Sequence, residues 1–146
     1  MGKTLTEEDG LRSLRDHIVE KANAARIKYG LYIDAETILK ILDDRAVVRY
    51  PTGLRFDEDS LLPGEFAQAL PLGEHPQEGF CIYVHPWFEN QKEIWPLLIA
   101  YHLVRVNYGE VAGADEAELF GATLLGLEVE TYYQALCELA DSIPQS

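Results

Sequence analysis

The chain has 146 residues, 47% of them hydrophobic, and a formal net charge of −13. This length and apolar content predict a single folded domain over residues 1–146, with a substantial core. The acidic charge argues against binding to nucleic acid or to an anionic membrane surface, because both require a basic footprint.

Two helices are predicted in the N-terminal third. The first begins at Thr4 or Thr6, has acidic residues in its first turn and ends at Gly30. The second is short, follows the capping residue Asp34 and ends before Asp43. In each helix the apolar residues recur at helical spacing, so we expect one stripe of each to face inward.

Three strands are predicted in the middle of the chain. Residues 46–50 (AVVRY) are rich in strand-forming side chains and stop at Pro51, and residues 52–63 have the composition of a loop. Residues 65–70 and 80–85 then form two paired strands, joined by a connection rich in turn residues. The pattern predicts a three-strand meander, that is, a small and mostly antiparallel sheet.

The most apolar long run, residues 90–109, predicts a central helix. Its apolar side chains cover nearly the whole circumference, which is typical of a helix in the middle of a domain. Asn90 and Glu93 have the spacing of a capping box, and Gly109 suits a helix end. Pro96 either marks the true first turn or kinks the helix.

Residues 115–125 and 128–140 predict two C-terminal helices, separated by Gly126. Strands and helices therefore occur in separate runs. This order predicts an α+β fold with a small sheet packed on an N-terminal helix, a central buried helix and the C-terminal helices.

Two further features concern the compartment. Residues 1–16 lack the apolar region of a signal peptide, and no apolar run is long enough for a bilayer. Cys81 and Cys137 fit buried reduced thiols better than a disulfide framework. We expect a cytoplasmic protein.

Two segments and the order of elements carry a family resemblance. Residues 94–102 read IWPLLIAYH, and residues 115–125 read DEAELFGATLL. Over residues 25–139 the chain resembles the ImmA/IrrE-type zincin metallopeptidases. In that family a strand leads into a helix carrying HExxH, and the next helix carries a third zinc ligand in a Glu-Ala-Asn-x-Phe-Ala-like segment. The resemblance implies a zincin-like fold, with Glu116 at the third ligand position.

The zinc chemistry of that family requires two histidines at i and i+4, and a glutamate beside the first that activates the bound water. The corresponding positions here are Leu98, His102 and Ile99. Leucine and isoleucine have no lone pair for a metal, and the two remaining groups, His102 and Glu116, are too few for a tight zinc site. We therefore expect no catalytic residue, no cofactor and no metal. The remnant cleft comprises Leu98, Ile99, His102 and Glu116.

His102 allows two interpretations. It is a core histidine hydrogen-bonded to Glu116, or it is a surviving metal ligand assisted by His85 or another carboxylate. The second interpretation makes the chain a metal-dependent peptidase with a non-standard site built around His102 and Glu116, with zinc as its metal. Otherwise His85, at a strand end, has a packing or surface role.

The expected function is binding by a non-catalytic zincin-like domain. The family cleft lies between the central helix and the sheet, where an extended peptide can add to an edge strand. Leu98 and Ile99 at its floor would suit a hydrophobic side chain. We expect a protein or peptide partner, because the family often acts on repressors or toxin–antitoxin regulators. Self-association through the aromatic segment 87–95, as a homodimer, is a second option. A third interpretation is a structural α+β domain whose family match is accidental.

Overall fold

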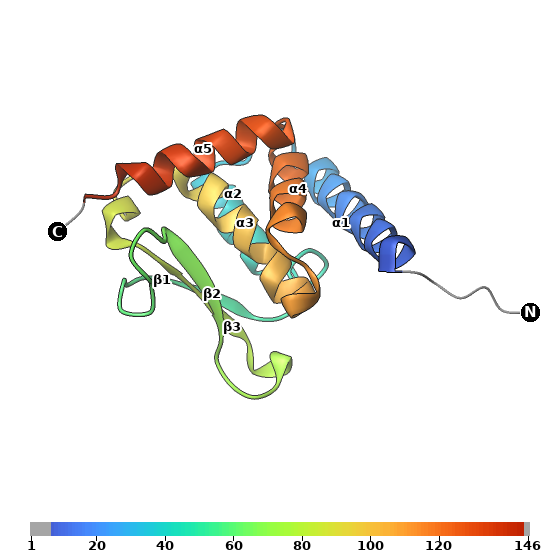
Figure 1. The fold of residues 1–146 in the computed structure, drawn as a ribbon, viewed down its shortest axis with the longest axis horizontal. Helices are drawn as coiled ribbons and strands as arrows, with labels where there is room; N and C mark the ends of the chain where they lie inside the picture. Colours follow the sequence, from blue (N-terminus) through green and yellow to red (C-terminus); the bar gives the residue numbers. More distant parts are fainter. Residues whose placement is uncertain (1–6, 145–146) are drawn as a thin grey trace, which may run out of the picture.

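A computed structural model describes residues 7–144 and has an α+β fold, as predicted (Figure 1). Thr4 and Thr6, the predicted start of the first helix, lie outside these residues. Within them the chain forms five α-helices and a three-stranded sheet. In chain order the elements are α1 (Glu7–Tyr29), α2 (Ala35–Leu42), β1 (Thr52–Phe56), β2 (Ala67–Pro71), β3 (Phe80–Val84), α3 (Trp95–Tyr108), α4 (Ala114–Leu125) and α5 (Val129–Ser142).

The sheet is mixed, so the predicted meander is wrong. Its order is β1-β3-β2, with β3 in the middle, parallel to β1 and antiparallel to β2. Ile82 at the centre of β3 pairs with Leu54 of β1 and with Ala69 of β2. The short connection between β2 and β3 makes these two strands a hairpin, and β1 then pairs with the other side of β3. As a result β2 is an edge strand.

The first strand was predicted in the wrong place. Residues 46–50 form turns, and β1 lies within the stretch predicted to be a loop. Val47 and Val48 are buried, but they belong to a turn whose amides bond to the carbonyl of Asp44. The side chain of Asn107 fixes this turn to α3, donating to Val47 O at 2.8 Å and accepting from Arg49 N at 2.7 Å. The β-branched residues therefore fill the core without joining the sheet.

Helix α3 lies between the sheet and α4, and α1 packs on α4 on the side remote from the sheet (Figure 1). Pro96 occupies the first turn of α3, which settles the two options for this residue. The predicted capping box of Asn90 and Glu93 is not formed, because the helix begins at Trp95 after Ile94, which provides no side-chain cap. The predicted end at Gly109 is confirmed.

The aromatic segment 87–95 is mostly core. Phe88 and Trp95 are buried, and Trp95 Nε1 donates to Phe88 O at 2.8 Å. Trp87 is the exposed ring of the three. This burial removes most of the surface on which we based self-association.

Both cysteines are free, as predicted. Cys81 is buried, but Cys137 is partly exposed, so the prediction of a buried thiol is wrong for Cys137. No helix within residues 7–144 is both long enough and apolar enough to cross a membrane.

Candidate functional site

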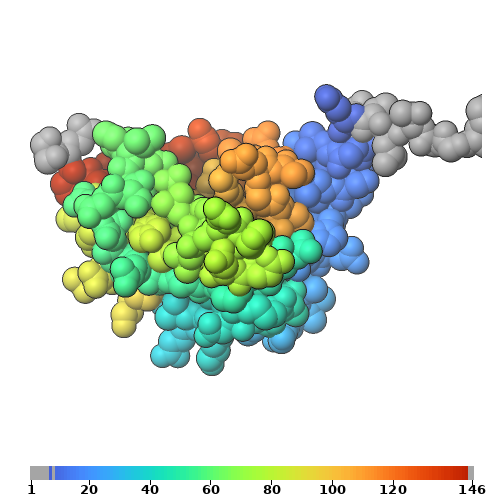
Figure 2. Space-filling view, turned by 90° about the horizontal axis from the view of Figure 1, so that it is seen from below, coloured from blue at the N-terminus to red at the C-terminus, as the bar shows by residue number. Residues whose placement is uncertain are grey.

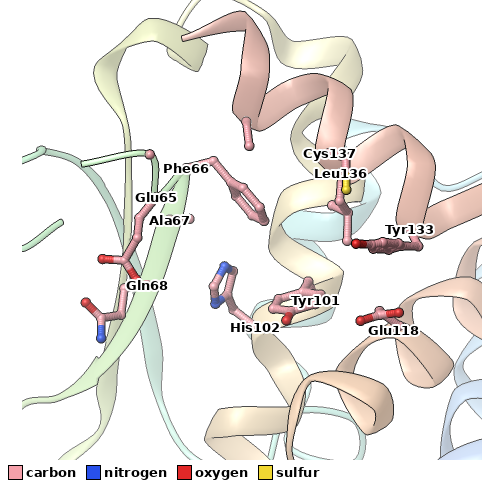
Figure 3. A pocket seen from close by; sticks show the side chains of 12 residues that line it. Glu65, Phe66, Ala67, Gln68, Tyr101, His102, Glu118, Tyr133, Leu136 and Cys137 are labelled. Atoms are coloured by element: carbon pink, nitrogen blue, oxygen red, sulfur yellow. The ribbon is translucent and has the colours of Figure 1, made fainter. Parts of the chain in front are cut away.

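A pocket of about 380 Å³ opens between β2, α3 and the C-terminal helices. We call it the central pocket (Figure 3). Its walls come from the segment leading into β2, the middle of α3, α4 and one face of α5. The side chains that matter below are Phe66, Ala67, Gln68, Tyr101, His102, Glu118, Tyr133, Leu136 and Cys137.

Two further pockets continue the central pocket along β2. The first, the α4-side pocket of about 240 Å³, shares Gln68, Tyr101 and His102 with it and reaches the start of α4. The second, the loop-side pocket, shares Gly64 and Glu65 and is bordered by the connection between β1 and β2. We call the three together the edge groove. In Figure 2, which views the molecule from the sheet side, the β2–β3 connection (yellow-green) and the start of α4 (orange) lie on the same face.

The free edge of β2 borders this groove. His85 N donates to Phe66 O and Leu72 N donates to Gly79 O, so alternate residues of this strand bond to β3. In an antiparallel pair the intervening residues direct their backbone groups to the opposite side. These residues are Ala67, which lines the central pocket, and Ala69, which lines the α4-side pocket. The groove therefore contains backbone donors and acceptors that a neighbouring strand can use.

His102 points into the space between β2 and Tyr101 (Figure 3). The residue is only 8% exposed, and its Nε2 atom has no hydrogen-bond partner. Its ring makes edge contacts with Phe66 and Tyr101, at centroid distances of 5.8 and 5.1 Å. Burial lowers the pKa of His102 to about 4, so the ring is neutral at pH 7.

The predicted hydrogen bond between His102 and Glu116 is not formed. Glu116 is buried at the first turn of α4, where Oε2 accepts from Arg15 Nη2 at 3.3 Å and Oε1 accepts from Gly113 N at 2.9 Å. These bonds hold the carboxylate toward α1 and the helix start. Glu116 therefore joins α1 to α4 and lines none of the three pockets.

Leu98 and Ile99 do not form the floor of the cleft. They are 0% and 1% exposed and line none of the three pockets. Helix α5 seals this turn of α3, since Tyr132 is fully buried and its hydroxyl donates to Leu97 O at 2.6 Å. The groove thus begins one turn later, at Tyr101 and His102.

The donors present do not fit a zinc site. Within residues 7–144 no three His, Cys, Asp or Glu side chains gather closely enough to hold a metal ion. His85, the suggested additional ligand, lies in the loop-side pocket with Nε2 at 3.2 Å from Glu58 Oε2, and its Nδ1 accepts from Trp87 N. The carboxylate of Glu116 is held by Arg15.

The reasoning from sequence missed several pocket residues. Tyr133 is not among the candidate residues named from the sequence, yet it is 40% exposed and lines the central pocket with Leu136 and Cys137. Residues 133, 136, 137 and 140 share one face of α5, so the 3.6-residue period could have grouped them. Glu118 lies two residues after Glu116, and no motif distinguishes it.

The groove combines a free strand edge with a pocket of aromatic and apolar side chains and a neutral imidazole. No protein-family model, curated protein or solved structure matches this chain. The chemistry available to the groove is hydrogen bonding to an extended backbone and uptake of a side chain.

Proposed function

We propose that this chain is a non-catalytic, zincin-like domain that binds an extended segment of a partner protein along the edge of β2. The observation that carries the proposal is the free edge at Ala67 and Ala69, which opens into a groove instead of being covered. An added strand satisfies such backbone groups, and a pocket beside the strand receives a side chain.

The order and packing of the elements support the zincin-like part of the proposal. Strand β3 leads into α3, and α4 follows with Glu116 in its first turn and packs directly on α3. The groove borders α3 and the edge of the sheet, and of the four residues expected in the remnant cleft it contains His102. The mixed sheet, in place of the expected meander, leaves the order of β3, α3 and α4 unchanged.

The side chains of α3 support the non-catalytic part. Leu98 and Ile99 replace a zinc ligand and the general base with hydrocarbon, and both are packed in the core. The remaining donors, His102 and Glu116, are not hydrogen-bonded to each other, since Glu116 bonds to Arg15 and Gly113 and Nε2 of His102 has no partner among the described residues. Metal-assisted hydrolysis would need three protein ligands and a base.

Metal content separates this proposal from a peptidase built around His102 and Glu116. Untagged protein purified without chelator is expected to contain no stoichiometric zinc and to melt at the same temperature with and without EDTA. Stoichiometric zinc that is lost when His102 is replaced by alanine would overturn the non-catalytic assignment.

Peptide binding tests the use of the β2 edge. Titration of ¹⁵N-labelled protein with acetyl-Thr-Val-Gln-Val-Thr-amide should shift the amide signals of Ala67 and Ala69. The variant Ala69→Pro removes one outward N–H without removing a bond to β3, so it should keep the fold and lose the binding. A matched Gln68→Pro variant, which loses a bond within the sheet, should instead lower the melting temperature. Binding that leaves the β2 signals unchanged contradicts the proposal.

A further inference from the structure

The wall of the central pocket toward α4 and α5 is negative. Glu118 is half-buried there, and burial, followed by the charges of Asp115 and Glu130, raises its pKa above the ordinary value. Among the described residues that line the central pocket, Glu65 and Glu118 are acidic and none is lysine or arginine. The negative potential is therefore not balanced within the pocket.

Aromatic rings accompany this charge. Figure 3 shows Tyr101, Tyr133 and Glu118 on the side of the pocket away from β2. The pKa of Tyr101 is raised, by burial first and then by the charge of Glu118. The same carboxylate contributes to the raised pKa of Tyr133, after the larger effect of the Cys137 thiol. Glu118 thus acts electrostatically on both phenol groups and lies on their side of the pocket (Figure 3), and aromatic rings together with a carboxylate are favourable surroundings for a cation.

An independent observation indicates that the pocket takes a ligand. Nε2 of His102 is buried and unpartnered, and the ring lies inside the pocket. An unsatisfied buried polar atom is costly unless a partner arrives. Because the ring is neutral at pH 7, it adds no positive charge that would repel a cation.

We propose that the central pocket receives an arginine or lysine side chain of the extended segment that binds along β2. The inference rests on the proposed function, because that segment delivers the side chain. The methylene stem packs against Leu136 and Phe66, and the cationic head lies beside Glu118 and the rings of Tyr101 and Tyr133.

Other side chains fit this pocket less well. A carboxylate would meet the combined charges of Glu118 and its neighbours. A leucine would cover Glu118 without neutralising it. The loop-side pocket extends the same potential, since Glu58, Glu65 and Asp141 border it, with His85 beside Glu58. A net charge of −13 further favours the approach of a basic segment.

The test compares four peptides, acetyl-Thr-Val-X-Val-Thr-amide with X as Arg, Gln, Leu or Glu, by titration of ¹⁵N-labelled protein. The Arg peptide should bind about fivefold more tightly than the Gln peptide, as expected for one half-exposed ion pair with a cation–π contact. The Glu118→Gln variant should remove this preference. Glu20→Gln is the matched control, with the same charge change at an exposed position of α1 outside the groove.

The outcomes separate the two proposals. If all four peptides shift Ala67 and Ala69 with equal affinity, the pocket has no preference for a basic side chain, and if Glu118→Gln keeps the preference for Arg, the cation does not lie beside Glu118. Either result overturns the inference, and strand addition stands. If no peptide shifts the β2 signals, both proposals fail. Loss of the Arg preference in Glu20→Gln to the same extent as in Glu118→Gln would also overturn the inference, since it would indicate a general charge effect.

Discussion

The buried imidazole of His102 predicts a specific loss of stability in acid. Its pKa is lowered from 6.5 to about 4 by burial, and no hydrogen bond compensates at Nε2. Between these two pH values the unfolded chain binds a proton at this position and the folded chain does not. The free energy of unfolding therefore falls as the pH decreases from 6.5 toward 4.

The magnitude follows from the two pKa values. At pH 5 the unfolded imidazole is almost fully protonated and the folded one is mostly neutral. The difference corresponds to about 2 kcal/mol of stability lost between pH 7 and pH 5. For a domain whose total stability is about 5–15 kcal/mol, a loss of this size is readily measured.

The measurement is urea unfolding followed by tryptophan fluorescence at pH 7, 6 and 5, for the wild type and for His102→Leu. Replacement by leucine removes the titrating group and an unpartnered buried nitrogen, so we expect the variant to be at least as stable as the wild type at pH 7. Between pH 7 and pH 5 the unfolding free energy of the variant should fall by about 2 kcal/mol less than that of the wild type. Asp44, whose pKa is lowered to about 2 with Lys28 as the largest cause, loses its contribution only below this range.

All other titrating groups are present in both the wild type and His102→Leu. Their contribution to the pH dependence of stability therefore cancels when the two proteins are compared. Parallel stability curves between pH 7 and pH 5 would refute the reasoning, because they would mean that His102 is not held neutral in the folded chain. His17→Gln, at an exposed position, is the control for replacing a histidine as such.

Two other substitutions test the packing. Asn107→Ala leaves the buried carbonyl of Val47 and the part-buried amide of Arg49 without partners and should lower the unfolding free energy by about 3 kcal/mol, measured by urea unfolding. Gly121→Ala would place a methyl group less than 3.0 Å from atoms of the fully buried Tyr132 side chain, well below the van der Waals contact distance, and should lower the unfolding free energy by about 2 kcal/mol. Its control is Gly10→Ala, an exposed helical position with open space, which should leave stability unchanged or raise it; equal effects of the two alanines would contradict the packing argument.

The helices were predictable because their signals are local. The period of apolar residues, Asp34 at one start and Gly126 at one end indicate α2 and α4 within about two residues of their observed bounds. The strand predicted at residues 46–50 is wrong because the contact that decides this segment's structure is distant in the sequence. Strand propensity favours these residues, but the side chain of Asn107, far away in the sequence, satisfies the backbone of the turn and keeps it out of the sheet.

The site was less predictable than the fold. The sequence indicated that His102 is the important side chain of α3, and the structure places it in the central pocket. The partner of Glu116 could not be inferred from a motif, because Arg15 precedes it by 101 residues. Likewise, the burial of the α3 turn that contains Leu98 depends on Tyr132 of α5, which donates to Leu97 O and lies 35 residues later in the sequence.

The position of the β2 edge, in a groove facing α5, restricts what can pair with it. An exposed edge strand invites edge-to-edge joining of two sheets, and so aggregation. Here Leu136 and Tyr133 of α5 stand opposite β2 across the central pocket. If strand addition occurs as proposed, a strand that is already part of a sheet would bring its neighbouring strands toward α5, whereas a lone extended segment would not. We therefore expect this edge to favour a tail or a loop over the joining of two sheets, and so to be less prone to fibril growth than an open edge.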